Sequence, residues 1–483
     1  MTAAPILAPE LGLGLSTSEL LDRLARHVKA EGSDRGSWLL FTAITGMFPN
    51  ARQLSQFRRS LSLASEATAI VAVLESTVEA ASLPHAEFRR LHLVHDRVLV
   101  DVDFCATHEH NTGIQRVVRR TVPVWAEAGR PFDLVAWTQD TSGLRSLTEP
   151  EADRVLNWNH RRFAPSYDAG AASPDSIESI IVPWNCQVFL AEVPSAAACT
   201  MLECLAASSG NRVSLLGYDA IPLVSAVGQR DEESERFAHY LTVVKHSEVV
   251  VAISESAAEE FRGFRDMLVA QGLAGPTVSS VSLAVDVPAA LKATQTEEGT
   301  RPLVLCVGSH EPRKNQEAVL FAADALYREG FDFELVFVGG GDTVVLHDFD
   351  KRIKRLNTRG GHVSSFRTLG DTQLWELYAR ARFSVFVSLH EGFGLPVAES
   401  LAFGTPALTS NFGSLAEIAL AGGCLMVDPR DDLQVVEGFR KMLTDDALID
   451  SLTAQAAAMV TKTWPEYADE LWSVAIEAGG VES

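Results

Sequence analysis

The segment 388–400, which reads SLHEGFGLPVAES, has the residue types of a loop that binds phosphate. It follows an apolar run typical of a strand, and Pro396 favours the first turn of a following helix because proline has no N–H to lose there. The glycines let the backbone approach a ligand closely, and the free N–H groups at the helix start form an anion site. The residues predicted to face this ligand are Gly392, Phe393, Gly394 and Leu395.

Two glutamates flank these glycines, Glu391 just before the predicted helix and Glu399 inside it. Each carboxylate can accept hydrogen bonds from two neighbouring hydroxyl groups, such as those of a sugar or a ribose. Two other interpretations are open at this point. The glutamates could belong to a solvated helix face, or they could be a pair of hydrolytic carboxylates.

A second polar loop, 308–315 (GSHEPRKN), follows the apolar run Leu303–Val307. Arg313 can grip two oxygens of a diphosphate, and the adjacent Lys314 adds a point charge. On its own, an Arg-Lys pair on a surface more often serves solubility. Because this pair and the two glutamates follow strands of the same predicted domain, the combination favours a diphosphate site over the two alternatives.

The E-x7-E pattern of the first segment, with GFGLP between the glutamates and the RK pair upstream, resembles the family 4 glycosyltransferases. These are retaining enzymes of the GT-B fold. The resemblance continues through SN at 410–411, GSLAE at 413–417 and DP at 428–429. It covers roughly residues 300–475 strongly and 95–290 more loosely.

The resemblance implies a role for each matching residue of the second domain. Glu399 would hold the ribose hydroxyls, and Glu391 would contact hydroxyls of the transferred sugar. Arg313 and Lys314 would neutralise the diphosphate leaving group. Main-chain groups of one further loop would border the base, at Arg367, Thr368 and Leu369. The catalytic set expected from the whole chain is Asp219, Glu391, Arg313 and Lys314.

The loop 111–116 (NTGIQR) resembles the Thr-Gly-Ile-x-Arg loop of some family 4 enzymes. Gly113 would let the backbone approach the diphosphate or the sugar from across the cleft. Asn111 and Thr112 are expected on the acceptor side. The alternative is a plain strand-to-helix turn.

Tyr218 and Asp219 stand where relatives usually read His-Asp-x-x-Pro. Asp219 is the candidate for orienting the acceptor or for steadying positive charge at the reacting carbon, and the alternative is an Asx turn before Pro222. Tyr218 is also placed on the acceptor side, but it departs from the family's histidine. One hypothesis for this departure is a donor with a different C6, for example a 6-deoxy sugar.

No metal site and no cofactor are expected, because the cation pair and the helix N-terminus can do the charge work of a divalent ion. The donor, a nucleotide-diphosphate sugar, is a co-substrate. Asp101-Val102-Asp103 has the D-x-D form, but it lies on the first strand of the first domain and is interpreted as loop or acceptor side. The segment 108–110 (HEH) is interpreted as a polar active-site loop rather than a metal site.

These residues require a scaffold that brings strand ends together. The predicted fold class is α/β, GT-B, with two Rossmann-like domains facing across a cleft and a small N-terminal all-helical module. The predicted parts are a helical module of unknown role at 1–90, an acceptor domain at 91–297, a nucleotide-sugar domain at 298–462 and a terminal helix at 463–483 that crosses back to the first domain.

Short apolar runs that alternate with helical stretches support this organisation. In the first domain, Leu91–Val94 with Val98–Val102 predicts a hairpin or a first strand. The polar stretch Lys292–Arg301 has the composition of a linker. In the module, a capping box at Ser16–Glu19 opens a helix, and a third helical pattern runs from about Ala51 into the seventies.

Composition narrows the class of function. The chain has 483 residues, 47% of them hydrophobic and 22% charged, with a formal charge of −22. That charge argues against nucleic acid and anionic lipid as partners. A cytoplasmic location is expected, because no apolar run suits a membrane span, the MTAAP start lacks a signal's basic residues, and the six scattered cysteines suit reduced thiols.

The sequence therefore predicts a retaining transferase that moves a hexose or deoxyhexose to an acceptor hydroxyl in glycan or polysaccharide biosynthesis. The acceptor could be a glycan, a lipid-linked sugar, a small molecule or a protein, and a homo-oligomer is compatible with the sequence. The alternative is a GT-B-fold binding or scaffold protein without turnover. The intact glutamates and cations argue against it. An epimerase or a phosphorylase fits the side chains less well.

Overall fold

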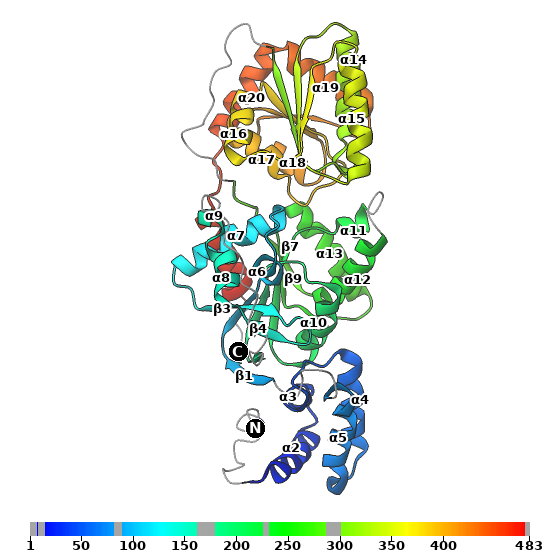
Figure 1. The fold of residues 1–483 in the computed structure, drawn as a ribbon, viewed down its shortest axis with the longest axis vertical. Helices are drawn as coiled ribbons and strands as arrows, with labels where there is room; N and C mark the ends of the chain where they lie inside the picture. The colour runs from blue at the N-terminus through cyan, green and yellow to red at the C-terminus, as the bar shows by residue number, and fades with distance from the viewer. Residues whose placement is uncertain are drawn as a thin grey trace.

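The computed structural model describes residue 7 and residues 15–81, 89–161, 179–225, 231–285 and 301–478. Three bodies follow one another along the longest axis: a helical module, a first sheet domain and a second sheet domain (Figure 1). This arrangement confirms the predicted α/β class with a helical N-terminal region. The boundary between 297 and 298 and most of the predicted linker (292–300) lie outside the described residues.

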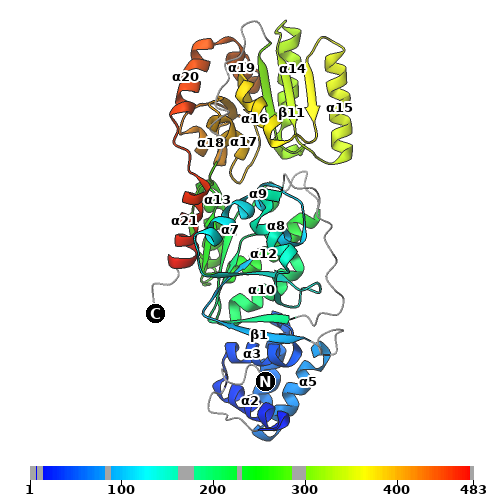
Figure 2. The same cartoon turned by 60° about the vertical axis from the view of Figure 1, so that its left-hand side comes forward.

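The N-terminal module packs on the end of the first domain that faces away from the second domain (Figures 1 and 2). Phe48 meets Trp137 of the first domain edge-on at 6.3 Å between ring centroids. The predicted third helix is in fact two, because the chain becomes extended at Ala64 and turns through a 3₁₀ segment. The elements are α2 (Thr17–Glu31), α3 (Asp34–Thr45), α4 (Ala51–Leu63), η1 (Glu66–Thr68) and α5 (Ala69–Ala81).

The first domain has a nine-stranded sheet in the order β1-β5-β4-β3-β2-β6-β7-β8-β9. Its strands are β1 (Arg90–His95), β2 (Val98–Asp101), β3 (Phe132–Trp137), β4 (Leu144–Ser146), β5 (Ser179–Trp184), β6 (Gln187–Leu190), β7 (Arg212–Gly217), β8 (Val249–Ala252) and β9 (Thr277–Ser280). All pairs are parallel except those of β4, which runs antiparallel to β3 and β5. The hairpin interpretation of the first two strands is wrong, because β1 pairs with β5 whereas β2 pairs with β3 and β6.

The helices of the first domain are the connections between these strands. They are α6 (Asp103–Thr107), α7 (Gly113–Glu127), α8 (Glu149–Leu156), α9 (Trp158–Arg161), α10 (Ala196–Ser208), α11 (Ile221–Val224), α12 (Asp231–His246) and α13 (Glu255–Ala270).

The second domain has a six-stranded parallel sheet in the order β12-β11-β10-β13-β14-β15. The strands are β10 (Leu303–Val307), β11 (Glu334–Val338), β12 (Val363–Phe366), β13 (Phe383–Phe386), β14 (Ala407–Ser410) and β15 (Cys424–Val427). The connections are η4 (Pro312–Lys314), α14 (Gln316–Arg328), α15 (Thr343–Asn357), α16 (Asp371–Arg380), α17 (Leu395–Ala402), α18 (Gly413–Ala419), α19 (Asp432–Thr444) and α20 (Asp446–Ala458). This strand order is that of a dinucleotide-binding α/β fold.

The last helix, α21 (Trp464–Trp472), returns to the first domain and lies against α7 (Figure 2). It continues into a π-helical turn, η5 (Ser473–Glu477). The indole of Trp125 on α7 donates to the carbonyl of Ala468 at 2.7 Å, and its ring lies 5.3 Å from that of Trp472. The returning helix therefore ties the second domain to the first through buried aromatic contacts.

Candidate active site between the two domains

The sheet order of the second domain explains why its two polar loops meet. β10 and β13 are neighbours, and the chain winds outward from them in opposite directions. The loops that leave their carboxyl ends therefore diverge and open a crevice at that edge. The loop after β10 carries Arg313 and Lys314, and the loop after β13 carries Glu391. Both predicted loops thus lie at one place in the fold.

Glu391 lies between the two predicted cations. Lys314 Nζ is 2.7 Å from Glu391 Oε1 and 2.8 Å from Oε2, and Arg313 Nη1 is 3.0 Å from Oε2. Their side chains are 9, 13 and 15% exposed, so solvent screens these charges weakly. Burial by itself would raise the pKa of Glu391, but Lys314 and Arg313 outweigh burial and hold that pKa below its ordinary value. Glu391 is therefore an anion that is held in place.

Main-chain contacts fix the two loops to each other. The carbonyl of Arg313 accepts from the N–H of Leu389 at 2.8 Å and from Ser388 Oγ at 3.0 Å. In return, Arg313 Nη1 donates to the carbonyl of His390 at 2.8 Å. The cations and the glutamate therefore sit on one bonded unit, which orients them before any ligand arrives.

The glycine-rich turn leads directly into α17. Gly394 has φ +111°, a conformation that side chains rarely adopt, and it is the residue before the first helical turn. Pro396 lies in that first turn, as predicted. Phe393 is buried in the same hydrophobic cluster as the core of the first domain. The turn thus presents main-chain groups at the domain interface, and the Phe393 side chain holds the domains together.

Glu399 lies inside α17 and faces the first domain. One of its oxygens pairs with Arg116 Nη1 of α7, and the other accepts from the hydroxyl of Tyr378 at 3.3 Å. The carboxylate predicted to hold a ribose is therefore engaged in a contact between the two domains. Arg116 was not among the predicted site residues, although it is the arginine of the Thr-Gly-Ile-x-Arg loop.

Asp219 lies directly opposite the glycine-rich turn. A Cβ built on Gly392 would come within 2.9 Å of Asp219 Oδ2, so the carboxylate touches this turn. Burial is the main cause that raises the pKa of Asp219 to about 6. Asp219 Oδ1 also accepts from the N–H of Ile221 at 3.1 Å, which is the Asx turn of the alternative interpretation. Asp219 thus forms an Asx turn and also lies at the contact between the two domains.

The placement of Tyr218 does not support its predicted role on the acceptor side. Its side chain is buried, and its hydroxyl donates to the carbonyl of Ala191 at 2.8 Å. The ring therefore lies in the core of the first domain, beyond the end of β7. The 6-deoxy hypothesis drawn from this substitution therefore loses its motivation.

One buried arginine holds the loop before α7 in place by hydrogen bonds to its main chain. Arg119 donates to the carbonyls of Cys105, His108 and His110 and to the side chain of Asn111. Its guanidinium also stacks on Trp158 at 3.7 Å. Thr112 is the N-cap residue of α7, with Gln115 completing a capping box. Local capping and one arginine thus shape the predicted loop.

Gly113 leads to a first testable prediction. A Cβ at this position would meet no atom within 4 Å, and the backbone does not need a positive φ. Gly113→Ala should therefore leave the melting temperature within about 2 °C, since a surface substitution changes stability by about 0.5 kcal/mol or less. If a ligand approaches this backbone, nucleotide-sugar affinity should fall about tenfold or more, measured by calorimetry. Unchanged affinity would remove Gly113 from the site.

The predicted base-binding loop lies farther along the second sheet. Arg367 follows β12, pairs with Asp350 and donates to Ser365 Oγ at 2.9 Å. Thr368 is exposed and Leu369 is partly buried. β11 separates β12 from β10, so this loop lies at the flank of the site rather than beside Glu391.

Helix caps also join the two domains. Ser254 Oγ accepts from the N–H of Ala257, as the cap of α13, and donates to the carbonyl of Gly392 at 2.6 Å. Glu417 of α18 accepts from the N–H groups of Glu255 and Ser256 at 3.2 and 3.1 Å. A carboxylate of the second domain thus sits at the positive end of a first-domain helix.

Three carboxylates lie deeper in the first domain, of which Asp101 and Glu192 are buried and Asp103 is partly buried. Asp101 accepts from the indole of Trp137 at 3.0 Å, and burial is the main cause that raises its pKa to about 8. Asp103 accepts from the N–H of Trp137, and Glu192 accepts from the N–H groups at the start of α6. Within the described ranges, no three His, Cys, Asp or Glu side chains are placed to hold a metal ion. Their bonds link the start of α6 to the end of β3 and to Glu192.

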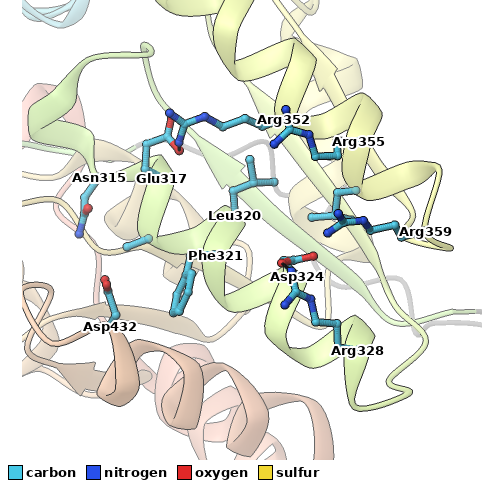
Figure 3. A pocket seen from close by; sticks show the side chains of 12 residues that line it. Asn315, Glu317, Leu320, Phe321, Asp324, Arg328, Arg352, Arg355, Arg359 and Asp432 are labelled. Carbon is cyan, nitrogen blue, oxygen red and sulfur yellow. Dashed lines mark hydrogen bonds and ion pairs between the residues drawn. The ribbon is translucent and has the colours of Figure 1, made fainter.

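A groove of about 490 Å³ opens elsewhere, on the outer surface of α14 and α15 (Figure 3). Arg352 pairs with Glu317, and Arg328 pairs with Asp324. The groove is lined by helix surfaces and by Asn315 at its rim, and not by the glycine-rich turn. It is a separate feature from the interdomain site.

None of the helices in the described part of the chain is both long and apolar enough to cross a membrane.

Comparison with known proteins adds the following relationships. Residues 289–459 match the family described as Glycosyl transferases group 1. The chain is 27% identical over 360 residues to the serotype-specific mannosyltransferase WbdA of Escherichia coli, covering 71% of this chain and 42% of that protein. It is 34% identical over 157 residues to the O-antigen chain mannosyltransferase B of Escherichia coli, and this match covers 32% of this chain and 40% of that protein. The matches thus span about two fifths of these relatives.

A solved structure shows the same fold. The α,α-trehalose 6-phosphate synthase of Burkholderia multivorans superposes with a TM-score of 0.53 at 13% identity, covering 81% of this chain and 100% of that one. The likeness confirms the predicted GT-B arrangement of two Rossmann-like domains.

Proposed function

The chain carries a Glycosyl transferases group 1 domain on a GT-B fold, and from this premise we propose that it is a retaining glycosyltransferase. It moves a hexose or deoxyhexose from a nucleotide-diphosphate sugar to an acceptor hydroxyl. The observation that carries the proposal is the largely shielded cluster of Lys314, Arg313 and Glu391, which lies close to Asp219 of the other domain.

In this proposal the donor binds to the second domain. Glu399 releases Arg116 and binds the ribose hydroxyls instead, and Glu391 binds hydroxyls of the sugar. Arg313 and Lys314 stabilise the negative charge that develops on the diphosphate as it leaves. The N-terminus of α17 adds a positive potential at the same place. These groups are already positioned, so little reorganisation is needed at the moment of reaction.

The acceptor reaches the sugar from the first domain. The bond between the anomeric carbon and the diphosphate breaks, and its electron pair leaves with the phosphate. The acceptor oxygen forms a bond to the same face of that carbon, and its proton passes to the departing phosphate oxygen. The Asp219 carboxylate steadies the positive charge of the oxocarbenium-like state. Closure of the cleft excludes water.

Mannose is the first sugar to test, and a polysaccharide is the first acceptor class. The motivation is that both relatives described above are mannosyltransferases, one of them acting on the O-antigen chain by its name. A lipid-linked sugar, a small molecule or a protein remain alternative acceptors.

The test is a thermal-shift panel of GDP, UDP, ADP and dTDP on the native chain and on Glu399→Ala. A ligand at 100 times its Kd stabilises a fold by about 2.7 kcal/mol. One nucleotide should therefore raise the melting temperature of the native chain by about 5 to 10 °C, since a domain of this size gains about 2–4 °C per kcal/mol. The same nucleotide should have little effect on Glu399→Ala.

Glu437→Ala is the matched control, because Glu437 is an exposed glutamate on α19 that pairs with Arg440. This variant should respond to the nucleotide as the native chain does. The proposal fails if the four nucleotides leave the native melting temperature unchanged, or if Glu399→Ala keeps the full shift.

A further inference from the structure

Two side chains of opposite domains meet beside the candidate site. His390, the residue before Glu391, comes from the second domain, and Glu260 comes from α13 of the first. His390 Nε2 donates to Glu260 Oε1 at 2.5 Å. The two side chains are only 14 and 15% exposed, so this contact is shielded from solvent. Shielded contacts of this kind hold their geometry better than exposed ion pairs.

The second oxygen of Glu260 binds a different loop. Glu260 Oε2 accepts from the N–H of Ala220 at 2.6 Å. Ala220 directly follows Asp219, the candidate for steadying charge at the reacting carbon. One carboxylate therefore joins the main chain beside Asp219 to the side chain beside Glu391.

His390 is held at its other end as well. Its Nδ1 shares a hydrogen bond with Ser225 Oγ of the first domain at 2.9 Å. Its carbonyl accepts from Arg313 Nη1 at 2.8 Å. The imidazole thus lies between two first-domain side chains, and its main chain belongs to the bonded unit of the cation loop.

We propose that Glu260 is a positioning residue that sets the distance between Asp219 and Glu391 by holding the two domains in the closed arrangement. This inference rests on the proposed function, because those two carboxylates are its candidate catalytic groups. Glu260 binds the residues that adjoin Asp219 and Glu391 in the chain. It acts through His390 and the N–H of Ala220.

Glu260 also affects Asp219 electrostatically. The charged groups around Asp219 are Arg313, Glu260 and Glu391. The pKa of Asp219 is raised to about 6, mainly by burial. The N–H of Ile221 and the charge of Arg313 lower this pKa, whereas the charges of Glu260 and Glu391 raise it. Glu260→Gln removes one of the negative charges that raise the pKa of Asp219, so Asp219 should ionise at lower pH. If turnover needs the Asp219 carboxylate, the acid limb of the rate profile then moves to lower pH.

The first arm of the test measures geometry without any substrate. One spin label is placed in each domain of the full chain, and the distance distribution is compared among variants. Glu260→Ala and His390→Ala should each broaden the distribution. The double variant should broaden it no further than His390→Ala does, because both changes remove the contact between Glu260 and His390. Glu259→Gln, at the exposed neighbouring position, should match the native chain.

The second arm measures turnover of a nucleotide sugar. Glu260→Gln keeps the side-chain shape, so it remains informative even if the alanine variant misfolds. It should lower kcat about 10- to 100-fold, the range expected when reacting groups shift by up to about 1 Å. The Kd of the nucleoside diphosphate should stay within about twofold of the native value, and the acid limb should move to lower pH.

The outcomes separate the two proposals. A native distance distribution in Glu260→Ala, or a loss of nucleotide affinity as large as the loss of kcat, overturns the positioning role. A chain that turns over no nucleotide sugar but opens in Glu260→Ala refutes the enzyme proposal while it supports the domain contact.

Discussion

Lys314→Ala should lower turnover of the nucleotide sugar by about 100- to 1000-fold, the usual effect of removing one group that stabilises developing charge. Lys314 Nζ contacts both oxygens of Glu391 at 2.7 and 2.8 Å. Its loss leaves the diphosphate with Arg313 alone and weakens the hold on the glutamate. The loss should appear in kcat more than in KM, because the charge to be neutralised grows as the diphosphate leaves.

The same variant should also be less stable. Removing one partner of a buried ion pair costs about 3–5 kcal/mol when the other charge stays unpaired. Here Arg313 still contacts Glu391 at 3.0 Å, so we expect the lower end of that range or less. Urea denaturation followed by circular dichroism measures this change, and steady-state kinetics below the transition measures turnover.

Lys351→Ala provides the matched control. Lys351 pairs with Asp348 on the exposed surface of α15, and its side chain is 59% exposed. Such surface pairs contribute about 0–1 kcal/mol, and this one lies on an outer helix. Turnover by Lys351→Ala should equal that of the native chain. If Lys314→Ala kept native kcat at native stability, the cation pair would not be part of the reaction.

Gly392→Ala should lower kcat/KM by about 100-fold or more, because it keeps the two domains from closing. The added Cβ would lie 2.6 Å from the carbonyl oxygen of Tyr218 and 2.9 Å from Asp219 Oδ2. The first of these atoms is main chain, so the contact cannot be relieved by turning a side chain. The domains must separate by a few tenths of an ångström or more.

Folding of each domain should survive this change, because the clash lies between domains and not within either core. Spin labels in the two domains should give a broader distance distribution, and circular dichroism should be unchanged. Gly263→Ala is the control, since a Cβ there meets nothing within 4 Å and the residue lies within α13. Native turnover by Gly392→Ala would show that the closed arrangement is not the reactive one.

The sequence by itself determined the strand and the loops that carry the chemistry of the second domain. The apolar run Leu303–Val307 coincides with β10 residue for residue. Strands buried on both faces need continuous apolar side chains, so a local pattern is enough to find them. The same holds for the capping box at Ser16, where the bonding partners lie three residues apart.

The sequence was less informative about the first domain. β4 has only three residues and pairs antiparallel with its neighbours, so no periodicity marks it. The apparent hairpin of β1 and β2 is two strands with three others between them. Tyr218 was judged from the family pattern, but its ring faces the core. Which strands pair, and into which side of the sheet a side chain points, depend on strands that are distant in the sequence. A local pattern does not contain this information.

Only the tertiary structure decided how the two halves of the site meet. Arg116 and Glu399 are separated by 283 positions, and Glu260 and His390 by 130. Each of these residues taken alone is typical of a solvated helix or loop surface. Its role arises because the contact between the domains brings one charge against another and shields the pair from solvent, which helps the pair to keep its geometry.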